Sequence, residues 1–348
     1  PPPVAPADSD AAATVITVTP LEPRPDSERP EAVPQVLRDG QTAHHRAAGL
    51  RIHGELTRWY FDKKSLRLYF RGDYGPAKLA YPFFGPAGQT SFDKLILHNS
   101  GKDLLLFRNQ LAERLSADAG GLISRSRPAL LFINGEPWGI YHIREAIDQR
   151  FLEENFAVPS ADLSDTPNIP SRQSAEQRRV DLVHWENFMA FVEENDLSDP
   201  ANYDYLQTQI DLENFVDYYL LEMYAGNTDW PHHNVHQFRP RTPGGRWEWL
   251  VWDNDRAFES IDRQMVDHVL VATHPLGERM ELLINKLLAN PEFYNLFLTR
   301  AADLLNTSLS TAAVQAQIDE LTGQLEPDIE IEKERWDISG DWADTVRH

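Results

Sequence analysis

The sequence contains no cysteine, and it has no long run of apolar residues. The first absence excludes a disulfide framework, a thiolate nucleophile and zinc held by cysteine ligands. The second predicts no transmembrane segment, because a membrane-spanning helix needs roughly 18 or more consecutive apolar residues. The opening residues, PPPVAPADSD, lack the charged and then apolar pattern of a leader, so we expect no signal peptide within them.

Basic residues are scarce relative to acidic ones. The 33 Lys and Arg residues stand against 54 Asp and Glu residues, which gives a formal net charge of −21. Such a charge repels nucleic acid and anionic lipid, so we expect no nucleic-acid partner. A nucleotide can still bind in a locally basic cleft or through metal ions.

Several familiar active-site patterns are also missing. The sequence contains neither GxGxxG nor GxxxxGK[ST], which excludes a Rossmann site and a P-loop. It also lacks GxSxG, and without cysteine it has no obvious hydrolase nucleophile.

The composition, with 41% hydrophobic and 10% aromatic residues among 348, is that of a folded globular protein. We expect an α+β fold with two lobes, because strand patterns dominate the first half and helix patterns the second. The expected segments are a Pro-rich, acidic tail or linker at 1–47 with one added strand at Thr14–Thr19, a β-rich N-lobe at 48–160, a connecting loop at 161–177 and a helical C-lobe at 178–348.

Alternating apolar and polar residues predict strands in the first half. The expected strands include Leu50–Ile52, Ser65–Phe70 and Lys94–Leu97. Asn134-Gly135 separates two further apolar runs and predicts a tight hairpin, because this dipeptide tolerates positive φ. Glu145 follows the second run, and a helix is expected at Ala146–Phe156.

Helical spacing dominates the second half. The expected helices include Val180–Glu194, Asp211–Tyr224, Arg279–Leu288 and Glu292–Leu305. Asp211 is expected to cap the second of these. Between the helices, Val235–Arg239 and Trp247–Trp252 are expected to form a hairpin.

Acidic and amide residues follow the apolar helix that ends near Gly226. Asp229 lies on the next loop with Asn234 five positions later, and the hairpin then delivers Asp253 and Asp255. Phosphoryl transfer needs a carboxylate to orient the attacking hydroxyl and hard oxygen ligands for Mg²⁺. A D-x-x-x-x-N loop followed by a metal-binding Asp is the arrangement that protein kinases use.

The same residues allow other interpretations. Asp229 and Asn234 are also common turn and cap residues, and Asp253 and Asp255 fit a solvated strand end. The WDND stretch lacks the loop pattern of an EF-hand, which disfavours that type of calcium site. His232-His233 stands without an HExxH frame, which disfavours zinc.

Several stretches resemble the CotH kinase family. GNTDWPHHNVHQF, WEWLVWDNDRAF and LFINGEPWGIYHIREAID resemble its signature, and RIHGELTRWYFDKKSLRLYF and LILHNSGKD resemble it more loosely. They stand in the family's order and span roughly residues 48–340. The resemblance implies an atypical protein-kinase-like fold with two lobes. It also implies ATP-dependent phosphorylation of spore-coat proteins on serine.

Residue by residue, the resemblance implies that Asp229 is the catalytic base. Asn234 and Asp253 would bind the metal that accompanies ATP, with Asp255 as a further ligand. The implied metal is Mg²⁺, or Mn²⁺ or Ca²⁺ in its place.

The resemblance also implies a Lys–Glu ion pair that holds the nucleotide phosphates. Glu145 would be its acid, and Lys64 is our choice for the base, with Lys63 as the competitor. His53 and His98 depart from the family, which usually has Arg at both positions.

Three functions remain open. The first is a kinase that phosphorylates Ser or Thr of a protein substrate. The second is a catalytically silent adhesion or binding protein, because a shared fold does not imply activity. The third is a kinase that acts on a glycan or another small acceptor. The resemblance leads us to expect an extracellular, cell-surface or spore-coat location.

Overall fold

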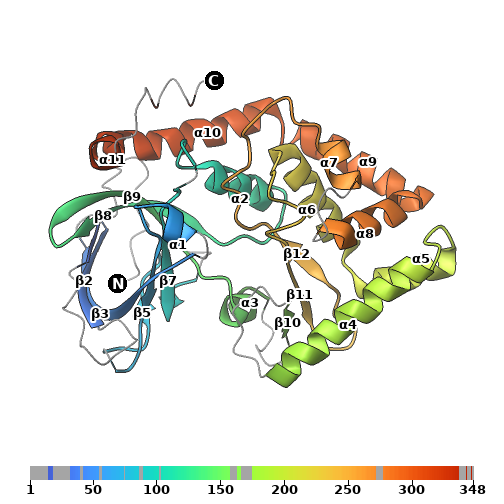
Figure 1. Ribbon diagram of the computed structural model, residues 1–348, viewed down its shortest axis with the longest axis horizontal. Helices are drawn as coiled ribbons and strands as arrows, with labels where there is room; N and C mark the ends of the chain where they lie inside the picture. Colours follow the sequence, from blue (N-terminus) through green and yellow to red (C-terminus); the bar gives the residue numbers. More distant parts are fainter. Residues whose placement is uncertain are drawn as a thin grey trace. The chain divides into compact units, whose positions relative to one another are not determined.

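The computed structural model describes residues 15–18, 32–39, 42–54, 57–73, 75–85, 89–101, 103–156, 163–165, 175–271, 277–336, 342 and 346. These residues form a mixed α/β structure that divides into two compact units (Figure 1). Unit 1 comprises Pro1–Phe107, Ser124–Ala146 and Asp319–His348, and unit 2 comprises Arg108–Ile123 and Ile147–Ile318. The units therefore interleave along the chain, whereas the sequence analysis divided it into consecutive segments.

Unit 1 is built on a closed sheet of seven strands in the order β1-β2-β3-β4-β7-β9-β8. These strands are β1 (Val15–Val18), β2 (Ala32–Asp39), β3 (Thr42–Ile52), β4 (Leu66–Tyr69), β7 (Lys94–His98), β8 (Ser126–Ile133) and β9 (Glu136–Arg144). Neighbouring strands are antiparallel except β1 and β8, which run parallel and close the sheet. The unit also contains α1 (Thr57–Tyr60), β5 (Leu79–Ala80), β6 (Ser91–Phe92), η3 (Glu326–Asp328) and α11 (Ile329–Trp336).

The strands expected in the first half are confirmed, and so is the tight hairpin. Asn134 and Gly135 join β8 to β9 with φ values of 55° and 84°, which is the left-handed conformation that a two-residue turn requires. The strand expected at Thr14–Thr19 is β1. Residues 32–47, expected as tail or linker, contain β2 and the start of β3. Pro34 lies inside β2, and a proline weakens the sequence signal of a strand.

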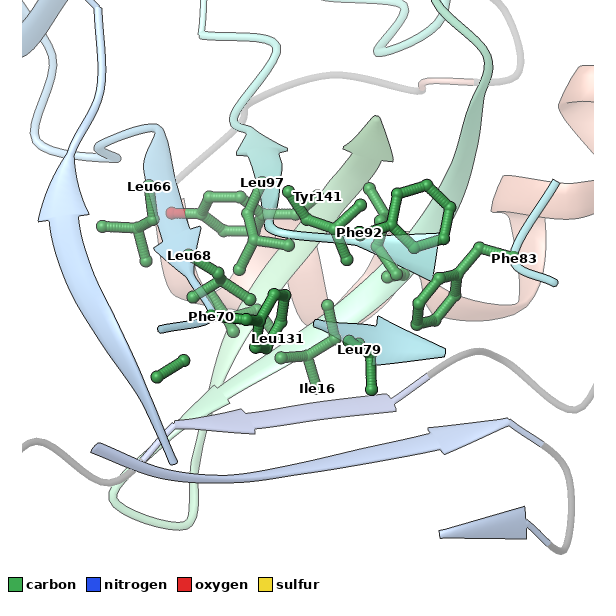
Figure 2. Packing of buried hydrophobic residues seen from close by; sticks show 14 residues of the cluster. Ile16, Leu66, Leu68, Phe70, Leu79, Phe83, Phe92, Leu97, Leu131 and Tyr141 are labelled. Carbon is green, nitrogen blue, oxygen red and sulfur yellow. The ribbon is translucent and has the colours of Figure 1, made fainter. Parts of the chain in front are cut away.

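Apolar side chains from the closed sheet, from β5 and β6 and from the segment between these two strands form the core of unit 1 (Figure 2). Leu66 and Leu68 on β4 alternate with half-buried residues, as a strand with one buried face requires. The other core members are Ile16, Ala48, Phe70, Leu79, Phe83, Phe92, Leu95, Leu97, Ala129, Leu131, Tyr141 and Ile143. The two-residue alternation therefore turns the opposite side chains of β4, β7 and β9 to the outer face of this sheet.

Helix α11 is attached to β9 and to Lys63 through the buried carboxylate of Glu332. Lys63 Nζ lies 2.5 Å from Glu332 Oε1 and donates to the Ile140 carbonyl at 2.7 Å. The Glu332 carboxylate also accepts the Ile140 N–H at 2.7 Å. Gly139 has a φ of +108°, and a Cβ at this position would collide with the side chains of Glu332 and Trp336. Glycine therefore permits the close approach of α11 to β9.

Unit 2 consists mainly of helices around a three-stranded sheet of order β10-β11-β12. Its strands are β10 (Leu163–Asp165), β11 (His236–Pro240) and β12 (Glu248–Leu250). Its helices are α2 (Arg108–Asp118), α3 (Gln149–Phe156), α4 (Ala175–Glu194), α5 (Pro200–Gln209), α6 (Leu212–Ala225), α7 (Met265–Leu270), α8 (Glu278–Leu288) and α9 (Pro291–Asn306), and α10 (Thr311–Leu325) contains its boundary with unit 1. The four helices expected in the second half are therefore confirmed as α4, α6, α8 and α9.

Side chains of α3 pack on the sheet of unit 2. Phe151 and Leu152 share a buried apolar cluster with Phe238 of β11 and Leu250 of β12. Among the described helices, none is both long and apolar enough to cross a membrane.

The Lys63–Glu332 pair generates a prediction about stability. Glu332→Ala leaves the Lys63 ammonium buried without its partner, so we expect the free energy of unfolding to fall by about 3–5 kcal/mol. Thermal melting measures the loss. Glu334→Ala, at an exposed position of the same helix, is the matched control and should change stability by less than about 0.5 kcal/mol. Equal melting temperatures for the two variants would contradict the structural role of the pair.

Candidate active site

Helix α6 determines where the candidate catalytic loop begins. Asp211 caps its first turn by accepting the Asn214 N–H at 3.1 Å, as the sequence predicted. The helix ends at Gly226, whose φ of 62° is left-handed and whose N–H donates to the Glu222 and Met223 carbonyls. Glycine takes this conformation at little cost, so the chain leaves the helix at a defined residue.

Trp230 anchors the loop that follows. Its ring is fully buried and packs edge-on against the rings of Tyr218 and Tyr219, with centroid distances of 5.9 and 4.6 Å. Its indole N–H donates to the Tyr218 hydroxyl at 2.7 Å, and its carbonyl lies 2.6 Å from His268 Nε2. Asp229, directly before this anchor, keeps 22% of its side chain exposed. The loop therefore presents a carboxylate to solvent from a fixed backbone.

The hairpin of β11 and β12 is attached to the same helix. Asn214 of α6 donates to the Trp249 carbonyl at 3.0 Å and accepts the Trp249 N–H at 2.6 Å. The buried ring of Trp249 also packs edge-on against Phe215 at a centroid distance of 4.8 Å. The segment after β12, which carries Asp253 and Asp255, is therefore positioned by α6 as well.

The two loops meet through side chains that the sequence analysis selected. Asn234 Nδ2 donates to the Asp253 carbonyl at 3.2 Å, and both residues adopt left-handed φ values, 59° and 56°. Asp229 Oδ1 lies 3.3 Å from Arg256 Nη1. Asp255 is buried, and its negative charge helps to raise the pKa of Arg256, after the larger effects of Glu259 and Asp229. The structure thus brings Asp229, Asn234, Asp253 and Asp255 into one region of unit 2.

Buried polar side chains lie beneath these loops. Asn227 Nδ2 donates to Glu222 Oε2 and to Asn254 Oδ1, at 3.0 Å in both cases. Asn254 Nδ2 lies 3.4 Å from Glu222 Oε1. Burial raises the pKa of Glu222 to about 7, although the two amide donors lower it. We call Glu222, Asn227 and Asn254 the Glu222 cluster.

The oxygen atoms at the meeting loops are of the type that a hard divalent cation binds. Asp253 and Asp255 carry carboxylates, and the bond from Asn234 Nδ2 to the Asp253 carbonyl does not use the Asn234 amide oxygen. Within the described part of the chain, no group of three His, Asp or Glu side chains forms a metal cluster of its own. Mg²⁺ binds proteins through one or two carboxylates together with waters and substrate phosphates.

The candidate nucleotide residues of unit 1 lie apart from one another. Lys64 Nζ donates to the Phe61 carbonyl, and Lys63 is paired with Glu332. The Glu145 carboxylate is buried and accepts the Arg125 N–H at 2.8 Å, with the Arg125 guanidinium 3.5 Å away. The structure therefore does not join Lys64 to Glu145. Glu145 also precedes α3 by several residues, whereas the sequence analysis placed it at the start of this helix.

Comparison with known families identifies the chain. A family model described as CotH kinase protein matches residues 50–348, which is most of the sequence. The chain belongs to the CotH kinase family. No curated protein matches it.

Two histidines of unit 1, His53 and His98, have a lowered pKa. Burial, together with the positive charges of Arg67, Arg144 and Arg58, lowers the pKa of His53 to about 3. Burial and Arg144 also hold the pKa of His98 well below its ordinary value. Both shifts favour the uncharged imidazole, so neither histidine supplies a fixed positive charge to unit 1.

The sequence analysis of this CotH protein missed Arg256 and the Glu222 cluster. Glu222 was detectable in principle, because it lies seven residues after Phe215 on the apolar face of α6, which also carries Tyr218 and Tyr219. A carboxylate on a buried face requires hydrogen-bond partners. Its partner Asn254 lies 32 residues away in sequence, and only the fold reveals it.

The raised pKa of Glu222 predicts a pH dependence of stability. The folded protein holds the Glu222 proton more tightly than the unfolded chain, so this group's contribution to stability is lost as pH rises from 4.5 to about 7. Glu222→Gln removes that loss. One pKa unit corresponds to roughly 1.4 kcal/mol. Between pH 4.5 and about 7, the free energy of unfolding of the variant minus that of the unmodified protein should therefore rise by about 3 kcal/mol.

Chemical denaturation at a series of pH values measures this difference. Glu213→Gln is the control, because Glu213 is exposed in the first turn of the same helix. Its difference from the unmodified protein should stay flat with pH. A flat difference for Glu222→Gln as well would overturn the assignment of a raised pKa.

Proposed function

We propose that this CotH protein is an ATP-dependent phosphotransferase that transfers the γ-phosphoryl group of ATP to Ser or Thr of a protein. Family membership supports a kinase-like activity. The observation that carries the proposal is the meeting of the Asp229 loop with the Asp253 loop, through the Asn234–Asp253 hydrogen bond and the Asp229–Arg256 ion pair. We also propose the two-lobed kinase-like arrangement that the family implies, with unit 1 as the N-lobe and unit 2 as the C-lobe.

Asp229 is the proposed base. Its carboxylate orients the acceptor hydroxyl and takes its proton while the hydroxyl oxygen bonds to the γ-phosphorus and the bond from that phosphorus to the ADP oxygen breaks. Burial of Trp230 supports this role, because it fixes the backbone next to Asp229. A fixed carboxylate loses little entropy when it meets the acceptor.

Asn234, Asp253 and Asp255 are the proposed metal ligands. Mg²⁺, or Mn²⁺ or Ca²⁺ in its place, would neutralise phosphate charge when bound there with ATP. The left-handed backbone of Asn234 and Asp253 supports the assignment, because non-glycine residues adopt it rarely and often at functional sites.

Lys64 is the proposed phosphate contact in unit 1. Lys63 is committed to Glu332 and Ile140, which favours Lys64 over its neighbour. Glu145 then acts either by exchanging its contact with Arg125 for one with Lys64 or by holding Arg125 toward the nucleotide. We also propose a spore-coat or cell-surface location on the strength of the family alone.

Asp229→Ala and Asp253→Ala test the two proposed roles. Each should reduce transfer of labelled phosphate from ATP by at least about 100-fold, because a base or a metal ligand acts in the transition state. Label is measured on the chain itself and on a Ser-rich test protein, with Mg²⁺ or Mn²⁺. Asp204→Ala, at an exposed position on α5, is the control and should transfer normally. Undiminished transfer by Asp229→Ala would contradict the assignment of Asp229 as the base.

Lys64→Ala tests the phosphate contact. Removing one charge–phosphate contact should raise KM for Mg-ATP by about tenfold with little change in melting temperature. Lys78→Ala, at an exposed position of the same unit, provides the comparison and should leave KM unchanged. An unchanged KM in Lys64→Ala would return the choice to other basic groups of unit 1.

The lowered pKa values of His53 and His98, at positions where the family resemblance implies arginine, favour a second candidate, a catalytically silent binding protein. Missing positive charge weakens phosphate binding, and a protein of this kind should show neither transfer nor a thermal shift with Mg-ATP. A thermal shift without transfer would instead indicate a nucleotide-binding protein that lacks the right acceptor.

A further inference from the structure

Three side chains of the Glu222 cluster are fully buried and are joined by hydrogen bonds. Asn227 Nδ2 bridges Glu222 Oε2 and Asn254 Oδ1, and Asn254 Nδ2 faces Glu222 Oε1. Each amide thus donates toward one oxygen of the same carboxylate. The three side chains form a closed ring of polar contacts beneath the candidate active site.

The cluster is connected to the loop that carries Asp229. Asn227 Oδ1 accepts the Asp229 N–H at 3.2 Å, and the Asn227 N–H lies 3.4 Å from the Glu222 carbonyl. Asn227 therefore ties the backbone of Asp229 to helix α6 with both its side chain and its main chain.

The cluster is equally connected to the metal-ligand segment. Asn254 stands between Asp253 and Asp255, and its N–H donates to Asn109 Oδ1 of α2 at 2.8 Å. Its carbonyl accepts the Ala257 N–H at 3.1 Å. Because a side chain and its own backbone move together, the position of Asn254 determines where its two acidic neighbours lie.

Burying a carboxylate costs free energy, because the charged group is removed from water. Apolar side chains of similar size generally stabilise a fold at least as well as a buried charged group. A polar network in which every member has a partner instead specifies one arrangement, because any shift leaves a buried donor or acceptor without one. The Glu222 cluster therefore fits a role in setting geometry better than a role in stability.

We propose that Glu222, Asn227 and Asn254 are positioning residues that fix the separation between the Asp229 carboxylate and the Asp253–Asp255 segment. The proposal rests on the proposed function, since it assigns these residues to the same site. The Glu222 carboxylate is the common acceptor, Asn227 holds the base loop, and Asn254 holds the metal-ligand segment. Catalysis depends steeply on such spacing, because small misplacements of reacting groups cost large factors in rate.

Glu222→Gln is the decisive substitution, because above pH 7, where Glu222 is mostly ionised, it keeps the size of the side chain but gives it one acceptor in place of two. One amide donor then faces another, and the spacing of the two loops loosens. We expect kcat for phosphoryl transfer to fall by about 10- to 100-fold, whereas KM for Mg-ATP changes by less than about threefold. Asn290→Ala is the control, since Asn290 is a buried cap on α9 that contacts neither loop. It should lower the melting temperature and leave kcat within about twofold.

The exchanged pair E222Q/N254D provides the rescue. The introduced amide at position 222 can then donate to the new carboxylate at position 254 while its oxygen accepts from Asn227, so the contacts within the cluster match again. The exchange loses the 3.4 Å contact of Asn254 Nδ2 with the Trp252 carbonyl, which lies outside the cluster. We expect kcat to recover at least about tenfold over Glu222→Gln alone. A purely structural role predicts instead that activity follows melting temperature in all four proteins, irrespective of the exchange.

Hydrogen exchange separates failure of this proposal from failure of the proposed function. Glu222→Gln should accelerate amide exchange in residues 226–234 and 251–258 together, E222Q/N254D should restore both, and Asn290→Ala should alter neither. If the unmodified protein transfers no phosphate, the kinase proposal fails, and exchange alone decides the positioning role. Acceleration in only one segment, or a kcat for Glu222→Gln within about threefold of the unmodified protein, overturns it.

Discussion

The burial of Trp230 at the end of α6 is the constraint on which the candidate site depends. Its ring fills the space beside Tyr218 and Tyr219, and its indole N–H is satisfied by the Tyr218 hydroxyl. A large aromatic side chain packed in this way leaves the adjacent backbone little freedom. The backbone of Asp229 is therefore held in place too, because Asp229 directly precedes Trp230. Gly226 contributes the other half of the constraint, because it ends the helix at one residue rather than over a frayed turn.

Helix α6 also holds the other segments of the site in place. The N-terminal half of α6 holds β12 through Asn214, and its C-terminal half holds the two loops through Glu222. Helices are stiff over this length, so groups attached to one helix keep their relative positions even when their own segments are irregular. Asn234 and Asp253 have strained, left-handed backbone conformations. Such conformations persist only where the surrounding structure holds them, and α6 provides that rigid surrounding here.

The sequence predicted those features that depend on neighbouring residues. The Asn134-Gly135 turn, the Asp211 cap and the helix ending at Gly226 each follow from the conformational preference of one or two residues. The Asp229–Asn234 spacing can be read directly from the sequence, and the role of these two residues stays a prediction. Contacts between residues far apart in the sequence could not be predicted in this way, because no local pattern marks them.

Lys63 and Glu332 illustrate the limit most clearly, since they lie 269 residues apart. Nothing in the run FDKKS distinguishes a buried lysine from a solvated one, and Lys63 was accordingly treated as the alternative to Lys64. Likewise, Glu145 was expected to meet a lysine, and its contact with Arg125 depends on the pairing of β8 with β9. Such contacts are properties of the tertiary fold, and local patterns do not encode them.

The docking of α11 on β9 has a consequence for the order in which the protein is made. Unit 1 contains segments on both sides of residues 147–318, which belong to unit 2 and are synthesised between them. Until Glu332 leaves the ribosome, Lys63 lacks the carboxylate that it pairs with in the folded protein, and α11 cannot pack against β9 at Gly139. The strands of the closed sheet are therefore made before most of unit 2, yet the sheet acquires its final stability only after translation of α11.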